Sequence, residues 1–340
     1  MDAAARHRDR HRGALPYVQV LGLLRERGGR LMSLTTTRDT DRRPPAPPDR
    51  VPARGSARGP GRRRVPWRRV ALHAGAAAVL VVLLYPLAWL VATSFKPADE
   101  VLASLALLPS RLATENYATA AEGIEGVTLL RLFGNSLTIS LGAVLGNVLS
   151  CSLAAYAFAR LRFTMRGPLF AFMIATIMLP HHAVLIPQYI VFNQLGMVNT
   201  FWPMVLPKFL ATDAFFVFLI VQFMRGLPRE LDEAAKIDGC GPFRIFVRVV
   251  LPLTRPALIT TAIFTFIWTW NDFFTQLIYL FEPDKYTLTL ALRTFVDTSS
   301  QSAYGPMFAM SVFALLPIVL FFLAFQRLLV EGMANSGLKG

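Results

Sequence analysis

Four polar or aromatic side chains lie within long apolar runs of this 340-residue chain, a setting in which ionisable groups are costly. Trp270, Asn271 and Asp272 are consecutive, and Asn147 lies in an earlier run. An indole can stack on a flat surface, and an amide and a carboxylate can hydrogen-bond hydroxyl groups, so this set can contact a sugar. In the other open interpretation, Asp272 pairs with Lys208 or with a backbone group and only fixes packing.

The run that carries Asn147 also has small and polar residues on a helical pattern. Gly142 and Gly146 have the spacing that lets another helix approach closely, and Ser136 and Ser140 add polar groups that a lipid-facing helix would avoid. Helix packing and a polar path through the membrane both explain this face.

A polar segment, 230–252, separates two long apolar runs and has the pattern of a folded element. Pro228 suits the first turn of a helix, and the acids that follow lie where the helix dipole favours negative charge. Asp232 and Lys236 have the spacing of an i,i+4 ion pair, and Gly239 is expected to end the helix in the left-handed conformation. Such order indicates a docking surface, although a helix pair that only stiffens the loop is the alternative.

A second short helix is expected after Pro242. Its apolar residues recur at i, i+3, i+4 and i+7, which predicts a stripe that leans on the membrane bundle and consists of Phe243, Phe246, Val247 and Val250.

Composition places the chain among polytopic membrane proteins with an all-α fold. Apolar residues make up 54% of the chain and charged residues 16%. Residues 1–70 hold 18 Lys and Arg against 6 Asp and Glu, which accounts for most of the net charge of +14. This Pro-, Arg- and Gly-rich stretch is predicted to be a disordered cytoplasmic tail that is attracted to anionic lipid, and its lack of aromatic residues argues against nucleic-acid binding.

Six membrane spans are predicted from apolar length, with prolines kinking the third and fourth. They cover about 71–95, 134–159, 168–189, 201–223, 257–280 and 305–326. Placing both termini and the 225–256 loop in the cytoplasm puts 29 Lys and Arg inside and 5 outside, as the positive-inside rule requires.

The chain lacks the sequence signatures of catalysis. It has no G-x-x-x-x-G-K-[ST] run, so ATP hydrolysis is expected on another polypeptide, and it has no HExxH, GxSxG or spaced Cys/His cluster. Cys151 and Cys240 predict neither a disulfide framework nor a metal site. We expect a transport subunit rather than an enzyme, with no cofactor in this chain.

At the polar segment the chain resembles a known family. Glu233-Ala-Ala-x-x-Asp-Gly239, followed by Leu251-Pro252, is similar to the EAA loop of permease subunits of bacterial ABC importers. More narrowly, residues 70–340 resemble the carbohydrate-uptake permeases of the maltose type, in the six-span partner. Flanking stretches agree, among them 94–97, 115–117, 154–157, 160–163 and 268–273.

The resemblance implies several partners: a second homologous permease, a cytoplasmic ATPase dimer that holds ATP and Mg²⁺, and an extracytoplasmic sugar-binding protein. The complex would lie in the bacterial inner membrane and carry a sugar. By position, the ATPase-coupling contact would consist of Glu233, Ala234, Ala235, Asp238 and Gly239. The tail residues that could also reach the ATPase are Leu338, Lys339 and Gly340.

Three alternatives remain at this level. An ABC permease for another solute would share the same loop. An ATPase-independent secondary transporter would need acids deep in the membrane for ion coupling, and Asp272 is the only one the predicted spans reveal. A membrane scaffold would not need the EAA-like element.

Overall fold

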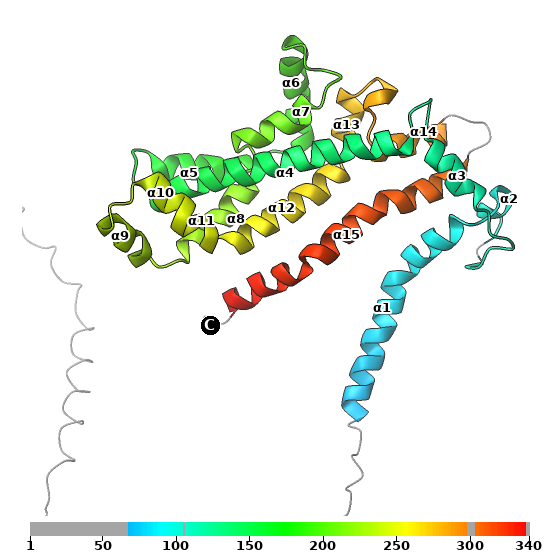
Figure 1. The fold of residues 1–340 in the computed structure, drawn as a ribbon, viewed down its shortest axis with the longest axis horizontal. Coiled ribbons are helices and arrows are strands. Elements are labelled where there is room, and N and C mark those ends of the chain that lie inside the picture. Colours follow the sequence, from blue (N-terminus) through cyan, green and yellow to red (C-terminus); the bar gives the residue numbers. More distant parts are fainter. Residues whose placement is uncertain (1–66, 105, 298–302, 338–340) are drawn as a thin grey trace, which may run out of the picture. The chain divides into compact units, whose positions relative to one another are not determined.

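The computed structural model describes residues 67–104, 106–297 and 303–337, and within these ranges the chain is helical with short connections (Figure 1). The all-α prediction is confirmed. The helices, in chain order, are α1 (Trp67–Thr93), α2 (Ala98–Val101), α3 (Glu115–Glu122), α4 (Leu129–Arg160), α5 (Arg166–Thr176), α6 (His181–Gln194), α7 (Trp202–Val205), η1 (Leu206–Leu210), α8 (Ala214–Arg225), α9 (Glu230–Ile237), α10 (Pro242–Ile245), η2 (Phe246–Val250), α11 (Leu251–Leu253), α12 (Arg255–Trp270), α13 (Phe274–Tyr279), η3 (Pro283–Lys285), α14 (Leu288–Asp297) and α15 (Tyr304–Gly337).

The six-span count is not confirmed. In the described residues four helical stretches are long and apolar enough to cross a membrane: Trp67–Thr93, Leu129–Arg160, Trp202–Arg225 and Tyr304–Gln326. A fifth results if 242–253 and 255–270, which bend by 76°, are joined. At 16 residues α12 alone extends about 24 Å, less than the roughly 30 Å apolar core of a bilayer.

The predicted third span, 168–189, is two separate helices rather than one kinked helix. α5 ends at Thr176 and α6 begins at His181. The two helices also have different neighbours: α5 packs on α8, and α6 packs on α13. Pro180 precedes α6 as its N-cap residue, where the missing backbone N–H costs nothing. The predicted tail, 1–70, lies outside the described residues except for its last four, which begin α1.

Helix α4 organises the bundle, since it packs against α8, α12, α14 and η1. Two glycines on one face of α4 allow a neighbouring segment to approach closely. A Cβ atom on Gly142 would lie 3.1 Å from Val205, and one on Gly146 would lie 2.6 Å from the ring of Phe209. The small-residue face thus packs against the broken segment α7–η1, as the packing interpretation predicted.

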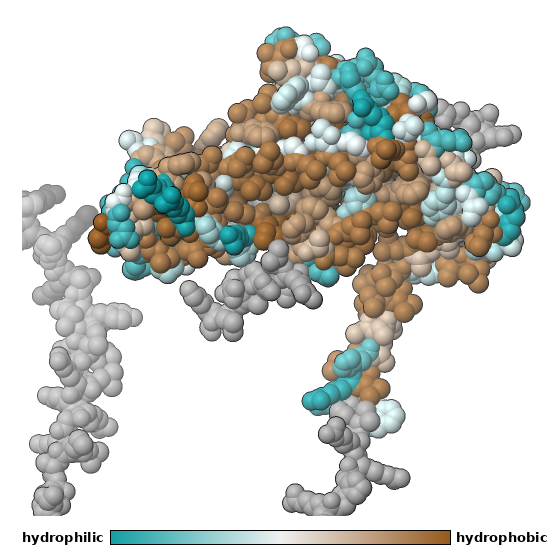
Figure 2. Space-filling model, in the orientation of Figure 1, coloured by the Kyte–Doolittle hydropathy of each residue, from teal (hydrophilic) through white to brown (hydrophobic). Residues whose placement is uncertain are grey.

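Apolar side chains cover the middle of the helices, and polar residues gather near α9 and near α2 and α3 (Figure 2). In α1 the most apolar 18-residue window has no buried residue within the chain, which leaves its apolar surface for lipid or another subunit.

Candidate functional sites

Helix α9, predicted from 230–239, ends as its sequence indicates. Gly239 has φ +78°, its N–H donates to the carbonyl of Lys236, and the N–H of Cys240 donates to that of Ala235 at 2.9 Å. These two bonds form the Schellman motif, which satisfies carbonyls that the helix end would otherwise leave free. The predicted left-handed cap is confirmed, and it fixes where the chain turns back toward the bundle.

One face of α9 is anchored and the other is free. Asp232 and Ala235 are buried, whereas Glu233, Ala234 and Asp238 are exposed. Ile237, at the end of the helix, is 88% exposed, so it offers apolar surface on this side of α9. Of the five predicted coupling residues, Ala235 therefore faces the protein and the other four lie on the open side.

Asp232 is held by α4 and not by its own helix, so the predicted pair with Lys236 is wrong. Its carboxylate lies 3.4 Å from Nη1 of Arg160, and the two side chains are 13% and 4% exposed. Nη2 of the same guanidinium donates to the carbonyls of Met224 at 2.9 Å and Leu227 at 3.0 Å, at the end of α8. A buried charge needs such partners, and the buried Arg160 stabilises the Asp232 carboxylate more than the exposed Lys236 would.

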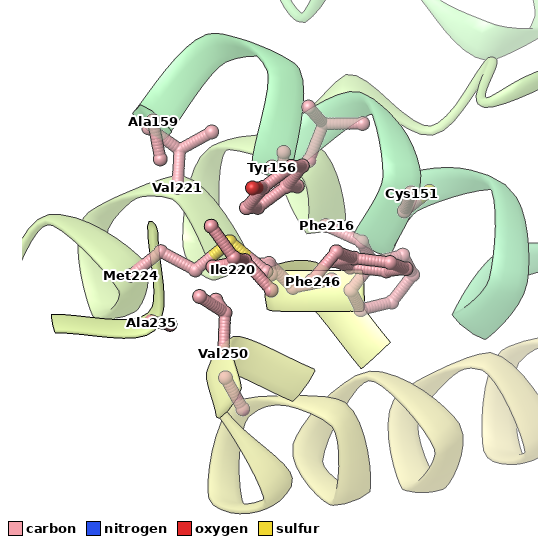
Figure 3. Packing of buried hydrophobic residues seen from close by; sticks show 14 residues of the cluster. Cys151, Tyr156, Ala159, Phe216, Ile220, Val221, Met224, Ala235, Phe246 and Val250 are labelled. Carbon is pink, nitrogen blue, oxygen red and sulfur yellow. The ribbon is translucent and has the colours of Figure 1, made fainter. Parts of the chain in front are cut away.

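The segment after α9 is held by α4 as well. The hydroxyl of Tyr156 donates to the carbonyl of Pro242 at 2.9 Å, and its ring lies 5.0 Å from that of Phe246. Figure 3 shows Tyr156, Phe246, Ala235 and Val250 in one apolar cluster with residues of α4 and α8.

The predicted stripe on this segment is half wrong. Phe246 and Val250 are buried, but Phe243 is 72% and Val247 42% exposed, and Ile245 is buried in their place. The π-helical turn η2 accounts for the pairing of Ile245 with Val250, because its wider spacing places residues five apart on one face. Phe243 thus joins the open side of the loop.

A second polar site lies inside the membrane-spanning part, around Asn147. The amide of this fully buried residue donates to the Asp213 carboxylate at 2.6 Å and to the Thr265 hydroxyl at 2.9 Å. Lys208 completes the site, with Nζ 2.8 Å from the same carboxylate oxygen. We call these four residues the Asp213 cluster; they come from α4, η1, the start of α8 and α12.

Sequence reasoning missed Asp213, and the statement that Asp272 is the only acid deep in a span is wrong. Asp213 lies within the helical stretch Trp202–Arg225, in the three-residue break that separates η1 from α8. The available signal was a polar pair, Thr212 and Asp213, in an apolar run that already contained a lysine.

The predicted set at 270–272 is not assembled into one site. Trp270 is 1% exposed, and its indole donates to the carbonyl of Ala314 at 3.0 Å. Asn271 is exposed and donates to its own helix at Ile267, and Asp272 accepts the N–H of Thr275 at 3.1 Å.

Of the two partners considered for Asp272, the structure therefore provides the backbone group and not Lys208, which pairs with Asp213. In the described part of the chain no hydrogen bond joins residues 270–272 to Asn147. The tail residues Leu338, Lys339 and Gly340 lie outside the described residues.

Comparison with known proteins identifies the family. The model described as "Binding-protein-dependent transport system inner membrane component" matches residues 146–335. The arabinooligosaccharides transport system permease protein AraQ of Halalkalibacterium halodurans is 34% identical over 79% of this chain and 96% of its own length. The galactooligosaccharides transport system permease protein GanQ of Bacillus subtilis is 30% identical over 76% and 92%.

The chain belongs to this family of ABC importer permeases and is a membrane-embedded transport subunit rather than an enzyme. A chain from the crystal structure of a bacterial ABC transporter that imports the acidic polysaccharide alginate has the same fold, with a TM-score of 0.66 at 20% identity over 79% of this chain and 99% of that chain.

Proposed function

We propose that this chain is one of two different permease subunits of a carbohydrate ABC importer, and that α9 couples it to a cytoplasmic ATPase dimer. The observation that carries the proposal is the two-sided character of α9. Asp232 and Ala235 anchor it to the bundle, while Glu233, Ala234 and Asp238 face outward. A helix held firmly on one side and open on the other is suited to receive a partner and to pass on its movement.

The chemistry of the open side favours a protein partner. The small side chain of Ala234 permits close approach, the exposed apolar surfaces of Ile237 and Phe243 gain from burial, and Glu233 offers a charge to a basic group. ATP and Mg²⁺ would be held by that partner, because this chain has no phosphate-binding loop. The C-terminal residues Leu338, Lys339 and Gly340 are proposed to approach the same partner.

A sugar is the proposed solute because relatives at 30% identity or more are named for oligosaccharides. The Asp213 cluster is the proposed polar lining of this subunit's half of the path. Lys208 and Asp213 are each about one quarter exposed, so their charges are accessible from one side of the helix bundle. Trp270, Asn271 and Asp272 remain proposed contributors near the far end of α12.

The rest of the assembly follows from the family and from charge. We place the chain in the bacterial inner membrane with both termini in the cytoplasm, since the Lys and Arg distribution favours that orientation. A second permease would cover part of its apolar surface, and an extracytoplasmic binding protein would deliver the solute.

The test is purification of the tagged chain in mild detergent with its neighbours co-expressed, followed by uptake of radiolabelled oligosaccharides into proteoliposomes that contain ATP. Wild type should retain a second permease and an ATPase. Glu233→Lys should lose ATP-driven uptake at unchanged membrane abundance, while Glu230→Lys on the same helix serves as the matched control. Solute flux by the purified chain alone would refute the proposal in favour of secondary transport.

A further inference from the structure

We propose that Arg160 is a positioning residue that links α9 to the α4–α8 helix pair, so that movement of α9 reaches the Asp213 cluster through these two helices. The inference rests on the proposed coupling function of α9 and names the residue through which the coupling would act.

Arg160 connects three helices with one side chain. It is the last residue of α4, and its Nη2 donates to the carbonyls of Met224, in the last turn of α8, and of Leu227, two residues beyond that helix. A cation is also favoured there by the helix dipole. Its Nη1 lies against the Asp232 carboxylate of α9. The planar guanidinium can serve all these acceptors at once, which the single ammonium group of lysine does less well.

The same two helices are joined again at the opposite end of α8. Asp213 is the residue before α8, and Asn147 of α4 donates to it at 2.6 Å. Asn147 and Arg160 are 13 residues apart on α4, about 20 Å along its axis. Between them, fully buried residues of both helices form one core, including Ala155, Ile220 and Val221.

α4 and α8 are therefore fixed to each other by polar contacts at both ends of α8 and by apolar packing between them. Densely packed helices move as units rather than deform, so a displacement at one end is carried to the other. Ala235 of α9 packs into the same core, and the Tyr156 hydroxyl holds the segment that follows α9. Arg160 supplies the charged contact that fixes the orientation of α9 relative to the α4–α8 helix pair.

The experiment uses the assembled importer in lipid nanodiscs and follows hydrogen–deuterium exchange with and without MgATP plus vanadate. Trapping the ATPase should change exchange at 230–238 and at 208–214 in wild type. Arg160→Met should raise resting exchange at 230–238 by about tenfold and reduce the trapping-induced change at 208–214 severalfold. Arg160→Lys should recover part of that change, because it keeps the charge.

The controls separate a coupling role from a structural one. Arg162→Met removes an equal charge from an exposed neighbour and should behave as wild type. Asp232→Asn breaks the contact from the α9 side while Arg160 keeps its two carbonyl acceptors, so it tests the link even where Arg160→Met fails to assemble; Glu230→Gln is its matched control.

If both broken-contact variants loosen α9 yet keep the full change at 208–214, Arg160 has no coupling role. If wild type itself binds no ATPase or shows no change at 230–238, the proposed function of α9 fails, and the Arg160 role fails with it.

Discussion

Alanine substitutions at three glycines of α4 should affect stability in a graded way that depends on the space beside each one. At Gly134 an added Cβ would meet nothing within 4 Å, so Gly134→Ala should gain about 0.5–1 kcal/mol from better helix propensity. At Gly142 the nearest atom would be Cγ1 of Val205 at 3.1 Å, a small overlap with a stiff β-branched side chain that roughly cancels the same gain.

Gly146→Ala should be destabilising. Its Cβ would lie 2.6 Å from the Phe209 ring and 3.1 Å from the backbone carbon of Lys208. Phe209 is 41% exposed, so its ring can rotate partly away, but the backbone of η1 cannot yield without moving Lys208 from the Asp213 cluster. Overpacking of this kind costs about 1–3 kcal/mol, which leaves a net loss of roughly 0.5–2 kcal/mol after the propensity gain.

Thermal unfolding of the purified importer, followed by fluorescence-detected size-exclusion chromatography, measures this series. One kcal/mol corresponds to about 1–2 °C in a chain of 340 residues. The melting temperature should therefore be highest for Gly134→Ala, intermediate for Gly142→Ala and lowest for Gly146→Ala. Uptake should fall only in the last. A Gly146→Ala protein as stable as Gly134→Ala would show that α4 does not pack on η1 as described.

Two further predictions concern charged residues. Asp213→Asn and Lys208→Met should each lower stability by about 1–2 kcal/mol, and a double-mutant cycle should give non-additive losses; additive losses would mean that the pair is not formed. Glu100 accepts hydrogen bonds from the backbone amide and then the hydroxyl of Ser110, which lowers its pKa. A lowered folded pKa means that its stabilisation is present above the ordinary glutamate pKa of about 4.3 and is lost as pH falls through the lower folded value. Limited proteolysis of the 98–112 loop should therefore increase only at acidic pH, and Glu100→Gln should remove that dependence; loop opening centred above the ordinary value would contradict the assignment.

Helix α9 shows which structural features the local sequence can predict and which it cannot. The end of α9 at Gly239 was predictable, because a left-handed glycine cap depends on the residue itself and its near neighbours. The partner of Asp232 was not, because Lys236 had suitable spacing and Arg160 lies in another helix. Burial decided between them, since a charge removed from water gains more from a buried cation than from a solvated one.

The membrane-spanning helices show the same difference between features that follow from local sequence and features that depend on packing. Apolar length predicted α1, α4 and the apolar part of α15, Tyr304–Gln326, within a few residues, because crossing a bilayer requires a continuous helix whatever its neighbours are. The split of 168–189 into α5 and α6 depends on the different helices against which each one packs, which no window of sequence contains.

The sequence by itself determined the class of protein, the all-α fold, the EAA-like segment and its left-handed cap, since these follow from composition, hydrophobic length and contacts within a few residues. Only the tertiary structure decided which charges meet. Arg160 with Asp232, and Lys208 and Asn147 with Asp213, join segments far apart along the chain. The physical reason is that a charge inside a packed, low-dielectric interior takes the partner that packing brings within reach, and the order of residues does not specify that packing.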